Sequence, residues 1–172
     1  MDDLPFLTSA AQHPQFPAGL PLARHAATRK LESWLSKMCD RMEAGAAWLL
    51  SIDLKEGVKC VGQISIVQTS EPMQWALAIW ISPEHWRRGL AREAAAASVQ
   101  FAFTQPSIHR IWAGVASWNK PSQGLIRSLG FRALGPTEVH GDEEILEFAL
   151  LREDHDATSL RAVPEPAPQD RS

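Results

Sequence analysis

The sequence contains no tyrosine and only two cysteines, and these absences narrow the chemistry that the chain can perform. Cys39 and Cys60 cannot build a disulfide framework, and neither has a neighbour at the spacing of metal ligands. We therefore interpret both as small buried hydrophobic residues. The six histidines are scattered, without an H-x-x-x-H pair or a carboxylate cluster, so we expect no metal site.

The sequence also has little net charge and no long hydrophobic run. The formal net charge is −3, with acidic and basic residues mixed along the chain, so no broad electrostatic field favours nucleic acid or an anionic membrane. The apolar stretches have the length of strands, well below the roughly 20 residues that cross a bilayer, and residues 1–5 lack the features of a signal peptide. We expect a cytoplasmic protein that binds neither nucleic acid nor membrane.

The composition supports one domain. Of the 172 residues 45% are hydrophobic, which is enough for one α/β domain with its own core. We assign residues 1–152 to this domain. Residues 153–172 are polar and rich in proline, without an apolar face to bury, so we expect a flexible C-terminal tail.

Hydrophobic periodicity predicts a mixed order of helices and strands. We predict helices at 4–12, 26–43, 89–103 and 120–129, and strands at 46–53, 58–68, 75–82, 108–117, 131–134 and 144–151. The polar turn at residues 55–57 indicates a hairpin, so the front half of the sheet is antiparallel. The nearly continuous apolar run at 75–82 is typical of a strand that is covered on both faces.

An arginine-rich loop joins that covered strand to an alanine-rich helix, within residues 81–94. The N-terminus of a helix offers unpaired N–H groups and the positive end of the helix dipole, and both favour phosphate. Gly89 allows a ligand to approach closely because it has no side chain. Arg87, Arg88 and Arg92 add positive charge. Taken alone, the pattern fits an ordinary connection with solvated arginines equally well.

A second segment, about thirty residues further on, makes the pattern more specific. Together the two segments resemble the GCN5-related N-acetyltransferases, the GNAT family. The family's loop for the pyrophosphate of CoA reads Q/R-x-x-G-x-G/A and matches this chain at Gly89 and Ala91. The family's N-x-x-S/A segment, followed by a helix that ends in G-F, matches at Asn119, Ser122, Gly130 and Phe131. Residues 77–94 are most similar to the branch that acetylates the N-termini of ribosomal proteins, and the resemblance spans about residues 46–151.

The chain departs from the family pattern in two places. Trp86 replaces the usual Gln or Arg of the loop, and Arg87 replaces its usual first Gly. The family normally opens with a strand before the first helix, whereas nothing before Leu4 can form one. We therefore expect the first edge strand to be absent.

The resemblance implies a GNAT fold, which is an α/β fold with a single mixed, mostly antiparallel central sheet, helices on both faces, and strands that splay at the acyl-CoA site. It implies acetyl-CoA as co-substrate, no metal, and a primary amine as acceptor, either a peptide N-terminus or a small molecule, and it is compatible with a homodimer. A backbone N–H near Trp80 or Ile81 would hold the thioester oxygen. The residues that it implies for CoA binding are Trp80, Ile81, Trp86, Arg87, Arg88, Gly89, Leu90, Ala91, Arg92, Asn119 and Ser122.

The resemblance leaves the proton transfers open. Many relatives protonate the leaving thiolate with a Tyr, but the matching position here is Ile126, so Ser122 is the leading substitute. Ser122 is equally explained as the third residue of a helix that Asn119 caps. For the general base, Glu71 and Glu84 are candidates, although both also fit ordinary turn carboxylates.

Two consequences follow for function. A lysine ammonium has a pKa of about 10.4 and an α-amino group of about 8, so a chain with weak base candidates favours an N-terminal α-amine or a small amine of lowered pKa. The alternative is a binding module of the same fold that holds an acyl-CoA without turnover, as a sensor or interaction subunit. Thiol release in the presence of amines distinguishes the two.

Overall fold

The computed structural model describes residues 3–136 and 144–161 of the 172-residue chain. Its helices are α1 (Leu4–Gln12), α2 (Pro21–Ala27), α3 (Leu31–Glu43), α4 (Leu90–Thr104), α5 (Lys120–Ser128) and α6 (Arg152–Arg161), and a short 3-10 helix, η1 (Pro83–His85), precedes α4. Its strands are β1 (Ala47–Ile52), β2 (Gly62–Gln68), β3 (Gln74–Ile81), β4 (Arg110–Ala116), β5 (Arg132–Pro136) and β6 (Ile145–Leu151). The six predicted strands are present with shifted ends, as are the helices predicted at 4–12, 89–103 and 120–129.

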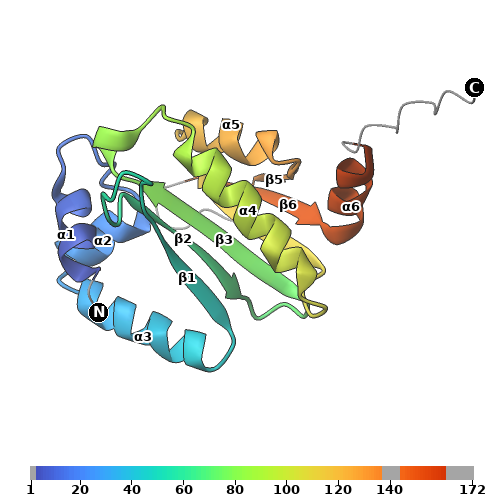
Figure 1. Cartoon of the computed structure of the whole chain (residues 1–172), viewed down its shortest axis with the longest axis horizontal. Coiled ribbons are helices and arrows are strands. Elements are labelled where there is room, and N and C mark those ends of the chain that lie inside the picture. The colour runs from blue at the N-terminus through green and yellow to red at the C-terminus, as the bar shows by residue number, and fades with distance from the viewer. Residues whose placement is uncertain (1–2, 137–143, 162–172) are drawn as a thin grey trace, which may run out of the picture.

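The strands form one mixed sheet in the order β1-β2-β3-β4-β6-β5. Among the strands of the described residues, only β3 and β4 pair in parallel, and the other neighbours are antiparallel. The two parallel strands are joined by α4, which Figure 1 shows lying across one face of the sheet over β3. This arrangement confirms the predicted single, mixed and mostly antiparallel sheet.

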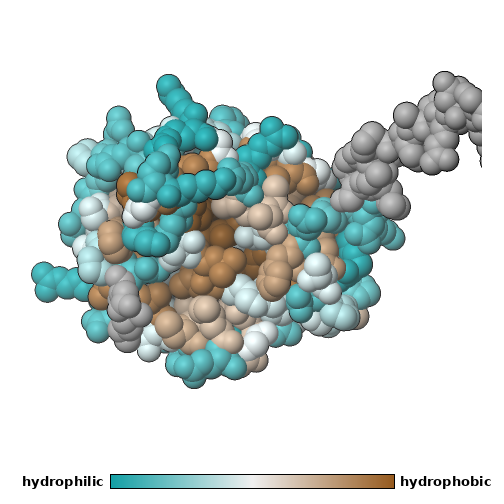
Figure 2. All heavy atoms as spheres, in the orientation of Figure 1, coloured by the Kyte–Doolittle hydropathy of each residue, from teal (hydrophilic) through white to brown (hydrophobic). Residues whose placement is uncertain are grey.

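The main hydrophobic core lies between the sheet and α4 and α5. It combines Ile64 and Ile66 of β2 with Ala95 and Val99 of α4, and it extends to Ile126 of α5. The small alanine side chains allow the helix axis to lie close to the strands. Figure 2, in the orientation of Figure 1, shows apolar residues gathered in the middle of this face with polar residues around them.

The opposite face of the sheet is covered by the three N-terminal helices. Their core includes Leu7 of α1, Leu22 of α2 and Leu31 of α3, together with Cys60, and Trp80 of β3 packs against it. Because side chains alternate along a strand, β2 turns its isoleucines to α4 and its polar residues to the helices α1–α3. Helices therefore cover both faces, as the resemblance implied.

Two segments differ from the sequence prediction. The helix expected at 26–43 begins only at Leu31, as α3, and a separate helix, α2, precedes it across a turn in which Arg29 adopts a φ of 55°. The first part of the expected tail is helical, as α6, and the first residue of this helix, Arg152, donates hydrogen bonds to the carbonyl oxygens of Phe103, Gln105 and Ile108. The rest of that tail lies outside the described residues. In the ranges that the structure describes, no helix is long and apolar enough to span a membrane.

Candidate active site

The parallel strands β3 and β4 separate toward their carboxyl ends. They pair only from Gln74 to Ala76 on β3 and from Arg110 to Trp112 on β4. Beyond these pairs, β3 continues to Ile81 and β4 to Ala116. The predicted splay is therefore present, and it opens a gap in the sheet at the end where both α4 and α5 begin.

The backbone of β3 alternates its N–H groups between β2 and this gap. Ser82 donates its N–H to the carbonyl oxygen of Val61 at 2.8 Å, and the register between β2 and β3 is unbroken. In an antiparallel pair, alternate residues point their N–H to the partner strand. The N–H of Trp80 therefore points to β2, whereas the N–H groups of Ile79 and Ile81 point into the gap. Of the two residues expected to hold the thioester oxygen, Ile81 has the required direction. Trp80 does not, because its amide is directed to β2.

The loop between β3 and α4 is fixed to β3 by a hydrogen bond and contains a residue with positive φ. Trp86 donates its indole N–H to the carbonyl oxygen of Ile81 at 2.7 Å, which ties the loop back to β3. Arg87 adopts a φ of 60°, in the left-handed region that glycine prefers. The residue that stands where the family pattern has glycine thus adopts a backbone conformation that glycine prefers.

Gly89 leaves free space in front of α4. It adopts a φ of 80° as the N-cap, and a Cβ built on it would meet no atom within 4 Å. No side chain among the described residues caps this helix. The N–H groups of Arg92 and Glu93 are the first to bond back, to the carbonyl oxygen of Gly89 at 3.0 and 3.1 Å. The amides before them, those of Leu90 and Ala91, have no helical partner.

Three exposed arginines surround this helix end. Arg87, Arg88 and Arg92 are all solvent-exposed, and Arg88 Nη1 lies 3.0 Å from Nδ1 of His85. Together with the unpaired amides and the positive end of the helix dipole, these arginines give the start of α4 the features that favour an anion. The pyrophosphate residues predicted from the sequence are therefore grouped in one place.

The second predicted segment lies at the same end of the sheet. Asn119 caps α5 by accepting the N–H of Ser122 at 3.2 Å, and Ser122 is half-buried. Gln123 is buried and donates to the carbonyl oxygens of Ala116 and Ser117 at 3.3 and 2.9 Å, which ties α5 to the end of β4. Ile126 is fully buried in the core, so its position supplies packing and faces no substrate.

The two carboxylates expected as bases are separated by the fold. Glu84 lies in η1, exposed, beside the phosphate loop. Glu71 lies in the turn before β3, so it is at the opposite end of the strand from Ile81, about 23 Å away at roughly 3.3 Å per residue. The structure does not bring Glu71 to the gap or to the start of α4, so its position gives no support to a role as the base.

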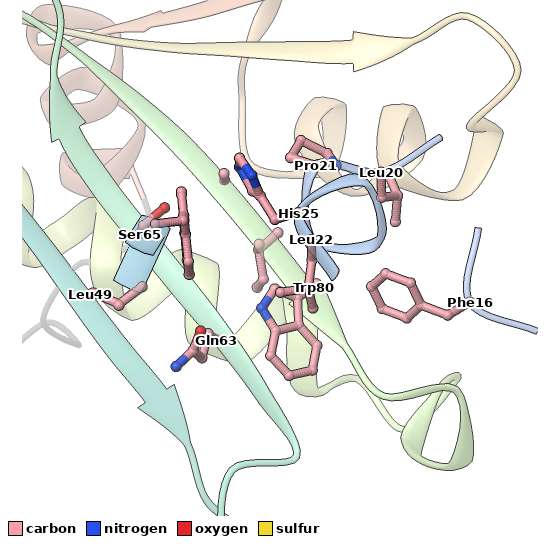
Figure 3. A pocket seen from close by; sticks show the side chains of 12 residues that line it. Phe16, Leu20, Pro21, Leu22, His25, Leu49, Gln63, Ser65 and Trp80 are labelled. Atoms are coloured by element: carbon pink, nitrogen blue, oxygen red, sulfur yellow. The ribbon is translucent and has the colours of Figure 1, made fainter. Parts of the chain in front are cut away.

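A cavity of about 100 Å³ lies beside the splay, on the face that α1–α3 cover. It is lined by Phe16, Leu20, Pro21, Leu22, His25, Trp34, Leu49, Gln63, Ser65, Ala78, Ile79 and Trp80. Figure 3 shows that His25 from α2 and the side chains of β2 and β3 converge on it from opposite sides. Residues 78–80 border both the gap and the cavity. A ligand in the gap and a second ligand in the cavity would therefore lie next to each other, on the two sides of β3.

His25 is a site residue that the sequence reasoning missed. Its ring stacks on that of Trp34, with centroids 5.7 Å apart. Burial, and to a smaller extent the charge of Lys30, lowers the pKa of His25 from its usual 6.5, so the ring is neutral near pH 7 and can accept a proton. The proline at the first position of α2 was a signal that could have revealed this helix.

Other titratable groups have structural explanations. Burial raises the pKa of the Cys60 thiol to about 11, so it is protonated at neutral pH and not a nucleophile. Within residues 3–136 and 144–161, no group of three His, Cys, Asp or Glu residues could hold a metal ion.

Comparison with known proteins is consistent with this geometry. Residues 1–132 match the family model described as acetyltransferase (GNAT) domain. Over 83 residues the chain is 31% identical to an uncharacterized N-acetyltransferase, YoaA, from Bacillus subtilis strain 168, a match that covers 48% of this chain and 46% of that protein. The chain thus matches about half the length of this curated relative.

Solved structures share the fold. Mycobacterium smegmatis RimJ in complex with CoA-disulfide superposes with a TM-score of 0.71 and 22% identity, over 92% of this chain and 85% of that one. Spermidine N-acetyltransferase from Vibrio cholerae in complex with CoA and spermine has a TM-score of 0.68 and 17% identity, over 90% of this chain and 92% of that one.

Proposed function

Because the chain belongs to the GNAT acetyltransferase family, we propose that it transfers an acetyl group from acetyl-CoA to a primary amine by direct attack in a ternary complex. The observation that carries this proposal is that the gap between β3 and β4, the open N-terminus of α4 and the cavity all lie at one end of the sheet. A donor and an acceptor can therefore meet at residues 78–81.

The residues at the start of α4 suit a diphosphate. The amides of Gly89, Leu90 and Ala91 donate to phosphate oxygens, and the absence of a side chain at position 89 lets these oxygens come close. Arg87 and Arg92 balance the charge. The two solved structures above, which are complexes with CoA-disulfide and with CoA, support this assignment.

The gap between the strands then receives the acyl arm. Acetyl-CoA supplies an acetyl group activated as a thioester. The N–H groups of Ile79 and Ile81 face the gap and are placed to stabilise negative charge that develops on the acyl oxygen. No covalent enzyme intermediate is needed, since the amine nitrogen bonds to the acyl carbon as the carbon–sulfur bond breaks.

Two proton transfers complete the reaction. The amine must lose a proton, and His25, neutral and beside the cavity, is the residue placed to accept it. An N-terminal α-amine or a small amine of lowered pKa needs less help than a lysine side chain and is the favoured acceptor. Ser122, half-buried in the first turn of α5, is the candidate that protonates the departing thiolate.

Two assays on the purified chain test this proposal. A rise in melting temperature on adding acetyl-CoA measures binding, and thiol release with a panel of amines measures turnover. We expect both. Binding without thiol release for any amine would instead identify a non-catalytic acyl-CoA-binding module, and no thermal shift would reject the assignment.

The role of Ser122 needs a separate variant. Ser122→Ala keeps the backbone N–H that Asn119 accepts, so the helix cap is preserved. We expect kcat to fall by about a hundredfold or more, the lower end of what a general acid contributes, with the affinity for acetyl-CoA unchanged. A kcat equal to that of the wild type would show that Ser122 only supplies the backbone N–H that Asn119 caps.

A further inference from the structure

Gln63 presents a buried hydrogen-bond acceptor that the protein does not satisfy. Its side chain is 2% exposed, in β2, on the face beneath α2. Its amide nitrogen donates to Oδ2 of Asp3 at 3.1 Å, whereas its Oε1 has no hydrogen-bond partner among the described residues. Buried polar atoms are nearly always paired, so an unpaired one beside a cavity indicates a ligand that pairs with it.

Asp3 determines which way the Gln63 amide faces. Its carboxylate oxygen Oδ2 also accepts a hydrogen bond from the hydroxyl of Ser51. A carboxylate only accepts hydrogen bonds, so the NH₂ group of Gln63 must face Asp3 and the oxygen must face away from it. Figure 3 shows this oxygen on the side of Ser65 and the nitrogen on the opposite side. The ligand that completes the site must therefore be a donor.

Apart from the hydroxyl of Ser65, the rest of the cavity wall is aromatic or aliphatic. Trp80 and Phe16 meet edge to face with ring centroids 6.1 Å apart, and Trp34 stacks on His25. None of the described residues that line the cavity is an Asp, Glu, Lys or Arg. A ligand that carries a second ammonium would therefore lose its water there without gaining a counter-charge.

On this basis, and resting on the function proposed above, we propose that Gln63, oriented by Asp3, accepts an N–H of the acceptor amine, and that the cavity selects monoamines with an apolar group near the nitrogen over polyamines. Gln63 is the residue that touches the amine, and Asp3 is a positioning residue. The cavity volume of about 100 Å³ is somewhat below the roughly 150 Å³ that holds benzene in an engineered protein cavity, so it suits one small apolar or aromatic group.

Substrate preference in the unaltered protein is the first test. Thiol release at saturating acetyl-CoA is measured with phenethylamine, with the α-amine of phenylalanine amide, and with putrescine and spermidine. We expect kcat/KM for the two aromatic monoamines to exceed that for the polyamines by about tenfold or more, because the second ammonium is desolvated. Preference for a polyamine would overturn the inference and leave acetyl transfer intact, whereas turnover of no amine would reject the proposed function itself.

Gln63→Leu is the second test. It removes the acceptor at similar volume, and we expect KM for phenethylamine to rise by about tenfold, the value of a hydrogen bond to a charged donor, while KM for acetyl-CoA stays unchanged. Gln68→Leu places the same substitution on the same strand at an exposed side chain and should change neither constant. An unchanged KM for the amine together with a lower melting temperature would show that Gln63 is only structural.

Asp3→Asn keeps the inference testable if Gln63→Leu does not fold. The asparagine amide can either accept from Gln63 or donate to it, so the orientation of Gln63 is no longer fixed. We expect a smaller rise in KM for the amine, again without a change for acetyl-CoA. An equal KM in this variant would overturn the positioning role of Asp3.

Discussion

Gly89 offers the sharpest perturbation of the phosphate-binding surface. It has a φ of 80°, and a Cβ at this position would meet no protein atom within 4 Å, so Gly89→Ala adds only a methyl group to open space. Gly45, after α3, is a matched control because its φ is 69° and its Cβ would also meet nothing. Alanine is preferable to valine, since a β-branched residue at positive φ is more strained.

The two variants should lose similar stability for the same reason. An L-residue in the left-handed region costs about 1 kcal/mol, which lowers the melting temperature of a chain of this size by roughly 2–4 °C. Only at position 89 does the methyl group also occupy the space that the diphosphate needs. Losing one charge-assisted hydrogen bond there costs about 1.5–3 kcal/mol, so the affinity for acetyl-CoA should fall by roughly 10–100-fold.

Differential scanning fluorimetry and isothermal titration calorimetry measure these two quantities. We expect both variants to show the small drop in melting temperature and only Gly89→Ala to show the loss of affinity. If Gly89→Ala binds acetyl-CoA as tightly as Gly45→Ala does, the diphosphate does not approach the start of α4, and our reasoning about this helix is refuted.

Three further predictions concern the backbone and His25. Arg87→Gly removes the strain of a φ of 60°, so we expect the melting temperature to rise by roughly 2–4 °C. Acetyl-CoA should bind more weakly because a positive charge is lost, and a less stable variant would contradict the reasoning about strain. Gly62→Ala places a Cβ 2.5 Å from the carbonyl oxygen of Trp80, so we expect the free energy of unfolding in urea to fall by about 2 kcal/mol. The control Gly124→Ala adds a Cβ to open space in α5 and should lose no stability, whereas equal stabilities of the two variants would show that the strands adjust freely. The pKa of His25 is lower in the folded state than in the unfolded state, so the stability of the wild type should fall as pH drops below 6.5. The melting temperature of His25→Gln should therefore depend less on pH between about 7.5 and 5.5 than that of the wild type, and an identical pH dependence would exclude this linkage.

The sequence predicted the elements around the phosphate loop well, because local signals mark their ends. Pro83 stops β3, and Gly89 begins α4 at a positive φ. The helix α2 was missed because seven residues are too short for a clear periodicity, so the tryptophan and histidine that stack against each other were not recognised as one wall of a cavity.

What the sequence could not provide is the relation between distant segments. Glu71 was a reasonable base candidate by its place before a buried strand, but the direction of that strand puts it at the wrong end. Asp3 and Gln63 are 60 positions apart, and only the fold brings their side chains to 3.1 Å. The left-handed conformation of Arg87 was also hidden, since its sequence neighbours alone do not impose it.

A crystal structure of the chain with acetyl-CoA tests the central claim most directly. Our account predicts diphosphate oxygens within about 2.7–3.2 Å of the N–H groups of Gly89, Leu90 or Ala91, with the acetyl group in the gap between β3 and β4. A diphosphate bound elsewhere, or an acyl arm that stays outside the gap, would contradict it.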